Sequence, residues 1–340
     1  MEGAYYNGQY LNRLERLGYS QAEIDNKLES TFEEMFYGPE GVRLCHCAGP
    51  DMMYIEDTGN HDVRTEGMSY AMMFCVQMNR QKEFDCLWRW VVTHMYLTEG
   101  ENAGYFAWSC HTDGSKNSDG PAPDGEEFFA MSLFFAANRW GSGEGVLDYA
   151  SWARRILHAC VHKGEEAGSG FPMWNPENHL IKFIPNCEFT DPSYHLPHFY
   201  ELFALWSDEC DRPFWHAAAA ASRQYLRKAC HAHTGLSAEY AEYDGRPHRG
   251  DQPDRHDWFF SDAYRTLGNI ALDAQWFGDK DGWAQETAAH IQQFFEEKEH
   301  GQTNGIYLID GTPVEGNALH PVGLLATIAQ GSLILDDACA

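Results

Sequence analysis

The sequence predicts an all-α fold in which antiparallel helix pairs form a bundle or an α/α toroid. Three observations predict it: apolar residues recur with the helical period, few segments alternate with period two, and no short repeat or Pro/Ser-rich linker divides the chain. We therefore expect a single domain over residues 1–340. Eleven helices are predicted, at 7–17, 20–36, 62–80, 82–96, 125–139, 146–163, 195–208, 213–231, 261–276, 280–299 and 320–335.

Local signals mark several helix ends. Ser20 and Glu23 have the spacing of a capping box, which predicts that a helix begins directly after Ser20. Pro213 has the position that proline prefers in the first turn of a helix. Gly141 and Gly278 fall where the periodicity stops, and glycine commonly ends helices.

Three connections between the predicted helices are long, at 97–124, 165–194 and 232–260. Long loops in a compact domain are usually functional or disordered, and these contain Trp, His and Asn residues that suit a ligand site. Trp108 and Trp174 lie in the first two loops. Each is expected either to stack on a sugar ring or to pack in the core.

The composition excludes some partners. The chain has 24 Lys and Arg against 51 Asp and Glu, a formal charge of −27, which repels nucleic acid and anionic membranes. Neither is expected as a partner. The 11 Trp, 17 Tyr and 20 Phe favour a carbohydrate-handling protein, because sugars offer apolar faces for stacking and hydroxyls for carboxylates.

The first residues show no secretory signal, and no apolar run is long enough to span a bilayer, so we expect a cytoplasmic protein. Its ten cysteines are then expected to be free thiols. Cys45 and Cys47 are too close together for a usual zinc knuckle. The spacing of a possible histidine set matches no ligand motif: His61, His111, His195, His198 and His256. We predict no metal and no cofactor.

Acidic or phenolic groups lie near the starts of four predicted helices that follow polar loops: Glu66, Asp124, Tyr194 and Asp262. If one end of a helical ring collects them, they could supply the acid and base of two-carboxylate glycoside hydrolysis. Local sequence alone leaves open which carboxyl group is the acid, whose pKa must be raised by burial or a neighbouring charge.

Each of these positions also has a purely structural interpretation, and Glu66 could simply be an acid that favours a helix start. Asp62 and Asp124 could be helix caps, and Ser261 could cap the helix at 261–276. Tyr194 could serve packing, and Asp262 could simply pair with Arg265 along the helix.

The run 122–140, with Asp124, Ala130, Ser132 and Trp140, resembles the signature of glycoside hydrolase family 8. Segments 62–70, 191–194 and 260–265 are similar to the members that release xylose from the reducing end of xylo-oligosaccharides, and the similarity covers nearly the whole chain. The resemblance implies an (α/α)6 barrel, a xylo-oligosaccharide substrate and an inverting mechanism.

By motif match, the resemblance implies that Glu66 is the general acid and Asp262 the general base. Tyr194 would help to hold the water, and Asp124 would bind the sugar at the cleavage subsite. Arg265 would orient the region around Asp262 and Tyr194.

The segment 319–321 is similar to the loop that blocks the cleft one sugar beyond the cleaved bond, with His320 bonding the reducing-end hydroxyl. Two other functions stay open: an endo-acting hydrolase of xylan, glucan or chitosan, and a non-catalytic oligosaccharide-binding protein. Eleven helices are one short of the twelve in the family barrel. The barrel is therefore expected to be incomplete at the C-terminus, with self-association through the gap.

Overall fold

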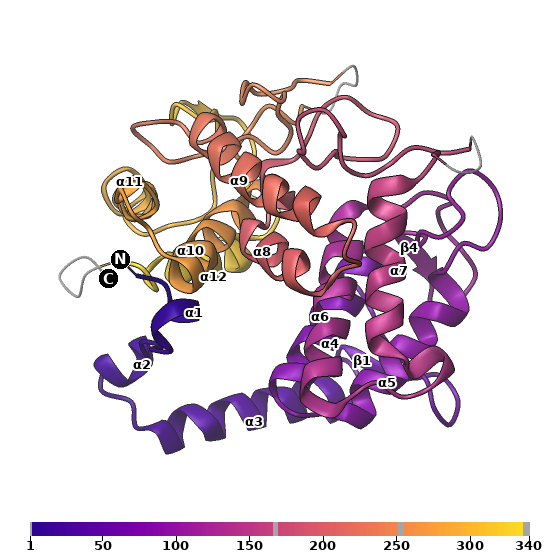
Figure 1. The fold of residues 1–340 in the computed structure, drawn as a ribbon. Helices are drawn as coiled ribbons and strands as arrows, with labels where there is room; N and C mark the ends of the chain where they lie inside the picture. Colours follow the sequence, from indigo (N-terminus) through magenta and orange to yellow (C-terminus); the bar gives the residue numbers. More distant parts are fainter. Residues whose placement is uncertain (1, 166–168, 251–254, 336–340) are drawn as a thin grey trace.

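The computed structural model describes residues 2–165, 169–250 and 255–335, and these are mostly helical (Figure 1). The prediction of an all-α protein is confirmed. The α-helices of these residues are α1 (Ala4–Asn7), α2 (Arg13–Arg16), α3 (Gln21–Tyr37), α4 (Thr65–Gln77), α5 (Gln81–Trp90), α6 (Pro123–Trp140), α7 (Tyr149–His162), α8 (Pro197–Trp206), α9 (Arg212–Ala229), α10 (Arg265–Phe277), α11 (Trp283–Glu299) and α12 (Pro321–Gly331).

Three small two-stranded antiparallel sheets interrupt the helices. They pair β1 (Cys45–Cys47) with β2 (Met53–Ile55), β3 (Asp62–Arg64) with β4 (Ser109–His111), and β5 (Ile306–Tyr307) with β6 (Pro313–Val314). Single helical turns lie at η1 (Val91–Met95), η2 (Gly145–Leu147), η3 (Pro192–Tyr194) and η4 (Ser261–Tyr264). No helix among the described residues is both long enough and apolar enough to cross a bilayer.

Several predicted boundaries agree with the structure. The side chains and backbones of Ser20 and Glu23 form the expected capping box at the start of α3. Pro213 lies in the first turn of α9, and Gly141 and Gly278 are the C-caps of α6 and α10.

The predicted helix at 7–17 is wrong. Beyond Asn7, only α2 is helical within this range, because Gly8 adopts a left-handed conformation that ends α1 at Asn7 and a new N-cap, Asn12, begins α2. Asp62 is not a cap either, since it pairs in β3 opposite His111 and α4 begins only at Thr65.

Two further capping expectations are wrong. Ala122 is the N-cap of α6, so Asp124 lies inside the first turn with its carboxylate free for other contacts. Ser261 makes no cap hydrogen bond, and its φ of 44° places it in a left-handed conformation that is unusual for a residue with a side chain.

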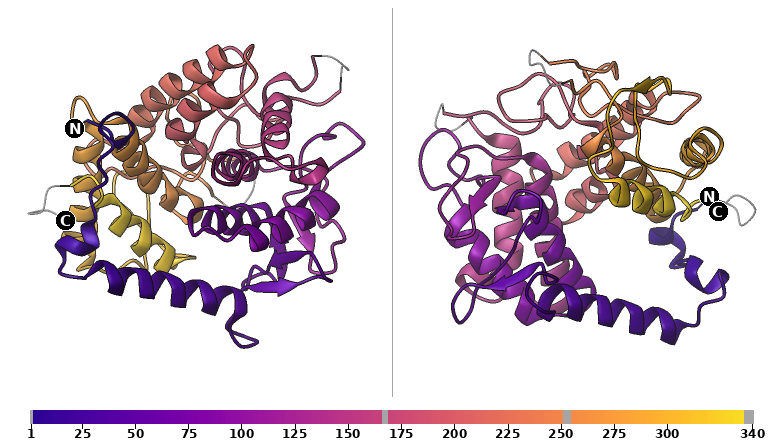
Figure 2. Two further views of the ribbon diagram at one scale, coloured as in Figure 1. Left: turned by 60° about the horizontal axis from the view of Figure 1, so that its bottom comes forward. Right: turned by 180° about the vertical axis from the view of Figure 1, so that it is seen from behind.

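Helices adjacent in sequence pack as pairs, α4 with α5, α6 with α7, α8 with α9, and α10 with α11, and contacts of α4 with α6 and of α10 with α12 join non-successive helices. Two views show the helices arranged around the molecule with α3 along one edge (Figure 2). Helix α6 is buried around almost its whole circumference, which fixes its position among α4, α7 and α8. The cysteines of the described residues are free thiols, and Cys339 lies outside those residues.

Candidate active site

A cleft of about 1030 Å³ opens where several long loops meet the starts of α4, α10 and α12. It is lined by six of the predicted site residues, Glu66, Trp108, Tyr194, Asp262, Arg265 and His320. Asp124 lines an adjoining apolar cavity of about 240 Å³, which shares Tyr70 and Arg265 with the cleft. The structure therefore brings together predicted site residues from five separate segments of the chain.

Arg265, the first residue of α10, connects the polar groups of this site. Its Nη1 donates hydrogen bonds to Asp124 Oδ2 at 2.8 Å and to Tyr70 Oη at 2.9 Å. Its Nη2 lies 3.2 Å from Asp262 Oδ1, and its guanidinium carbon lies 5.6 Å from the centre of the Tyr194 ring. One planar cation therefore sets the positions of two carboxylates and two phenols.

Glu66 occupies the first turn of α4, where the helix dipole favours an ionised carboxylate. Burial has the larger effect and, with the negative charge of Asp124, raises the pKa of Glu66 to about 8 despite the opposing Arg265. Thr65 Oγ1 lies 3.3 Å from Glu66 Oε2. The carboxyl group is therefore protonated at neutral pH, the state that a general acid needs.

Asp124 is buried, with 3% of its surface exposed, and projects from the first turn of α6. Its Oδ1 accepts a hydrogen bond from the Gly125 N–H at 3.0 Å. Burial raises the pKa of Asp124, while the ion pair with Arg265 opposes that shift. A Cβ on Gly125 would come within 2.5 Å of Thr65 Cβ, so glycine allows α6 and α4 to start side by side.

Asp262 lies in η4 with 39% of its side chain exposed, so water can reach it. Tyr194, in η3, is buried, and burial together with nearby carboxylates raises the pKa of its hydroxyl well above the ordinary value. Asn269 Nδ2 donates to the Ser193 carbonyl at 2.7 Å and fixes η3 against α10. The Asp191 side chain caps η3 by accepting from the Ser193 N–H.

The walls of the cleft are aromatic. Trp108 is partly exposed and stacks with the Arg64 guanidinium, whose central carbon lies 5.1 Å from the ring centre. Phe183 and Tyr240, with ring centres 4.2 Å apart, also line the cleft and were not predicted. Both lie in the long loops that the sequence marks as functional, but no local signal distinguishes them from other loop aromatics.

Leu319 and His320 border the cleft immediately before α12, and both are exposed. Trp174, by contrast, is 1% exposed and packs edge-on against Trp215 and Tyr200. Its indole is not available to a sugar, so the predicted substrate-binding role of Trp174 is wrong and the alternative of a core role holds.

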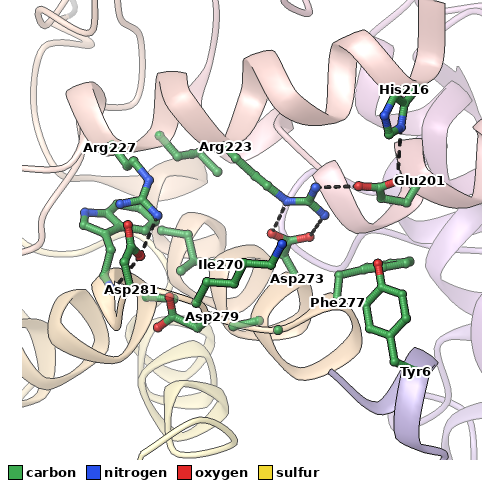
Figure 3. Close-up of a pocket in the computed structure, with 16 residues that line it drawn as sticks. Tyr6, Glu201, His216, Arg223, Arg227, Ile270, Asp273, Phe277, Asp279 and Asp281 are labelled. Carbon is green, nitrogen blue, oxygen red and sulfur yellow. Dashed lines mark hydrogen bonds and ion pairs between the residues drawn. The ribbon is translucent and has the colours of Figure 1, made fainter. Parts of the chain in front are cut away.

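A second cavity, of about 490 Å³, lies beside the C-terminal halves of α9 and α10 (Figure 3). Arg223 forms a two-pronged ion pair with Asp273, at 2.7 and 2.8 Å, and also bonds Glu201. Arg227 pairs with Asp281 at 2.9 Å. In this cavity each of the two arginines is thus paired with carboxylates on the neighbouring elements.

The chain belongs to glycoside hydrolase family 8: the sequence profile of glycosyl hydrolases family 8 matches residues 19–330. The reducing end xylose-releasing exo-oligoxylanase of Halalkalibacterium halodurans is 55% identical over 98% of this chain and 84% of its own length. Endoglucanase 2 of Ruminiclostridium josui is 25% identical over 95% of this chain and 65% of its own length.

The structure is also similar to solved structures. Rex8A from Paenibacillus barcinonensis, solved in complex with xylose, superimposes with a TM-score of 0.96 at 54% identity, covering 100% of this chain and 89% of that chain. At this level of identity the similarity extends beyond the fold to most of the sequence.

Proposed function

We propose that the protein is an inverting glycoside hydrolase that releases xylose from the reducing end of β-1,4-xylo-oligosaccharides. One observation carries the proposal: Glu66, a partly buried carboxyl group whose pKa is raised to about 8, shares a cleft with the solvent-accessible carboxylate of Asp262. The 55% identity to the exo-oligoxylanase of Halalkalibacterium halodurans supports the substrate.

In the proposed mechanism, Glu66 gives its proton to the oxygen that links the two sugars. Asp262 removes a proton from a water that attacks the opposite face of the ring, and the hydroxyl of Tyr194 holds that water. Asp124 accepts hydrogen bonds from the sugar at the cleavage site. Arg265 supports this role because it fixes the carboxylates of Asp124 and Asp262 on one guanidinium.

The exo mode of action is proposed from the segment at 319–321. Leu319 and His320 border the cleft, and a wall one sugar beyond the cleaved bond would admit a single residue there. The imidazole of His320 can bond the reducing-end hydroxyl, and a site built to bond a hydroxyl discriminates strongly against ligands that lack one. Trp108, stacked under Arg64, is proposed to face a sugar ring.

Two alternatives are less well supported. An endo-acting hydrolase needs a cleft open at both ends, and the endoglucanase relative is only 25% identical. A non-catalytic binding protein would not need a carboxyl group held protonated beside an exposed carboxylate.

The experiment that tests the exo proposal uses xylotriose carrying ¹³C in its reducing-end sugar. We expect the label in free xylose from the first turnover onward. Label in xylobiose would contradict release from the reducing end, and cleavage of long xylan into mixed oligomers would favour the endo alternative.

The finer architecture belongs to the same proposal. We propose a single domain built as an (α/α)6 barrel, supported by the pairing of successive helices and by their arrangement in Figure 2. The proposed self-association is supported by apolar side chains exposed on α12, Val322 at 79% and Leu325 at 53%, and light scattering checks it. A cytoplasmic location stays a prediction, which cell fractionation checks.

A further inference from the structure

Two histidines and an aspartate meet on the outside of the helical layer, at residues that the proposed reaction does not use. His158 and His162 lie one turn apart on α7, with ring centres 4.6 Å apart. Asp211, directly before α9, faces them, with Oδ1 at 2.7 Å from His162 Nε2 and Oδ2 at 3.7 Å from His158 Nδ1. One ligand atom from each residue lies within 4.8 Å of the other two.

The Asp211 side chain does not act as a helix cap. Asp211 occupies the N-cap position of α9, yet its side chain makes no capping hydrogen bond. The carboxylate is 3% exposed, and its Oδ2 has no hydrogen-bond partner. A buried carboxylate oxygen without a hydrogen bond is costly, and the nearby basic group His158 Nδ1 is 3.7 Å away, so a cation between the two is favoured.

The surroundings of His162 give the same indication. Its Nε2 faces Asp211 and its Nδ1 lies 2.9 Å from Glu165 Oε2, so both ring nitrogens point at carboxylates that only accept. A neutral imidazole has one N–H and satisfies one of them. Either a second proton or a metal ion must therefore sit between Nε2 and Asp211.

We propose that His158, His162 and Asp211 bind a divalent transition-metal ion of the zinc class, with water completing a tetrahedral site. Two imidazoles and one carboxylate are a ligand set that zinc uses, at about 2.0–2.2 Å from the ion. Ligand atoms in such a site lie about 3.3 Å apart by tetrahedral geometry. The 2.7 and 3.7 Å separations require only small side-chain shifts.

Glu165 would then take the outer role that carboxylates play in histidine metal sites. It accepts from the Nδ1–H of His162, which fixes the tautomer that presents Nε2 to the ion. The ion would join the C-terminal turn of α7 to the start of α9, two elements that are far apart in sequence. Its expected effect is on stability, because the site lies away from the residues that line the cleft.

The test uses untagged protein, treated with chelator and dialysed, and ZnCl₂ as the probe. We expect calorimetry to show one Zn²⁺ per chain and the melting temperature to rise with Zn²⁺. Substitution of the exposed ligand, His158→Ala, should weaken binding by about tenfold or more, as should Asp211→Asn, since even outer partners of a metal site are worth about 10–100-fold. Co²⁺ in the same site should give the visible absorption of a four-coordinate ion.

Two variants serve as controls. His216→Ala removes an exposed histidine of α9 that lies 3.6 Å from Glu201, and it should bind Zn²⁺ as the parent protein does. Cys210→Ser removes the exposed thiol beside Asp211 and should also retain binding. Absence of binding, binding unchanged in His158→Ala, or binding lost only in Cys210→Ser would each overturn the proposal, and the first would leave a protonated His162 as the partner of Asp211.

Discussion

Arg265 Nη1 and Asp124 Oδ2, 141 residues apart in sequence, meet at 2.8 Å where α10 and α6 both begin. The same guanidinium reaches Asp262 and Tyr70, so it holds the cleft in one arrangement. A lysine at this position could not present several N–H groups in one plane.

We therefore expect Arg265→Lys to lower kcat/KM for xylotriose by about 10²-fold, the cost of misplacing catalytic groups by about 1 Å. The matched control is Arg223→Lys, which changes a similarly paired arginine at the second cavity and should retain activity. Equal losses in both variants would mean that general stability, rather than positioning in the cleft, explains the effect.

If Glu66 is the general acid, as proposed, its pKa of about 8 sets the alkaline side of the pH profile. A general acid works only while protonated, so kcat/KM should be lost as pH rises through about 8, tenfold per pH unit beyond it. Asp124 helps to raise this pKa. In Asp124→Asn the alkaline loss of the residual activity should therefore begin at lower pH. If the pH of this loss does not change, a group other than Glu66 is responsible for it.

Glu66→Gln should separate catalysis from stability. Loss of the acid should reduce kcat by about 10²–10⁴-fold, whereas calorimetry should still detect oligosaccharide binding. Glu126→Gln changes a buried carboxyl group that accepts from the Phe106 N–H outside the cleft, and this control should keep its turnover.

The melting temperature gives an independent readout of Glu66→Gln. Because folding raises the pKa of Glu66 from its ordinary value to about 8, stability present at low pH is lost as pH rises through this range. Glutamine mimics the protonated form, so the variant should melt about 2 °C or more above the parent at pH 8, using about 2–4 °C per kcal/mol. Near pH 4 the difference should vanish, and a variant less stable at pH 8 would contradict this account.

Trp108 and Trp174 provide a paired comparison. Trp108→Ala should raise KM with little change in stability, because Trp108 is a partly exposed residue of the cleft wall. Trp174→Ala should cost about 3–5 kcal/mol in the free energy of unfolding, measured in urea, because it empties a packed core position. An unchanged KM in Trp108→Ala would remove it from sugar binding.

The sequence predicted the parts of the site that carry local signals. Glu66, Asp124, Tyr194 and Asp262 lie in short motifs near helix starts, and the structure places them around one cation. The sequence could not show which of Trp108 and Trp174 is exposed, since both lie in long loops and only tertiary packing decides their burial.

Structural features that depend on residues far apart in the chain also could not be predicted from local sequence. The strand at Asp62 forms because it pairs with β4, almost 50 residues further on, so a helix at 62–80 was the natural local prediction. Local sequence also could not show which carboxyl group has a raised pKa, because the pKa of Glu66 depends on burial and on Asp124 in another helix.

Time-resolved proton NMR of xylotriose hydrolysis tests the central claim most directly. An inverting cleavage by Glu66 and Asp262 predicts that xylobiose first appears as the α-anomer and equilibrates only later by mutarotation. Xylobiose that first appears as the β-anomer would contradict the account, because it would require a covalent intermediate in place of a water activated by Asp262.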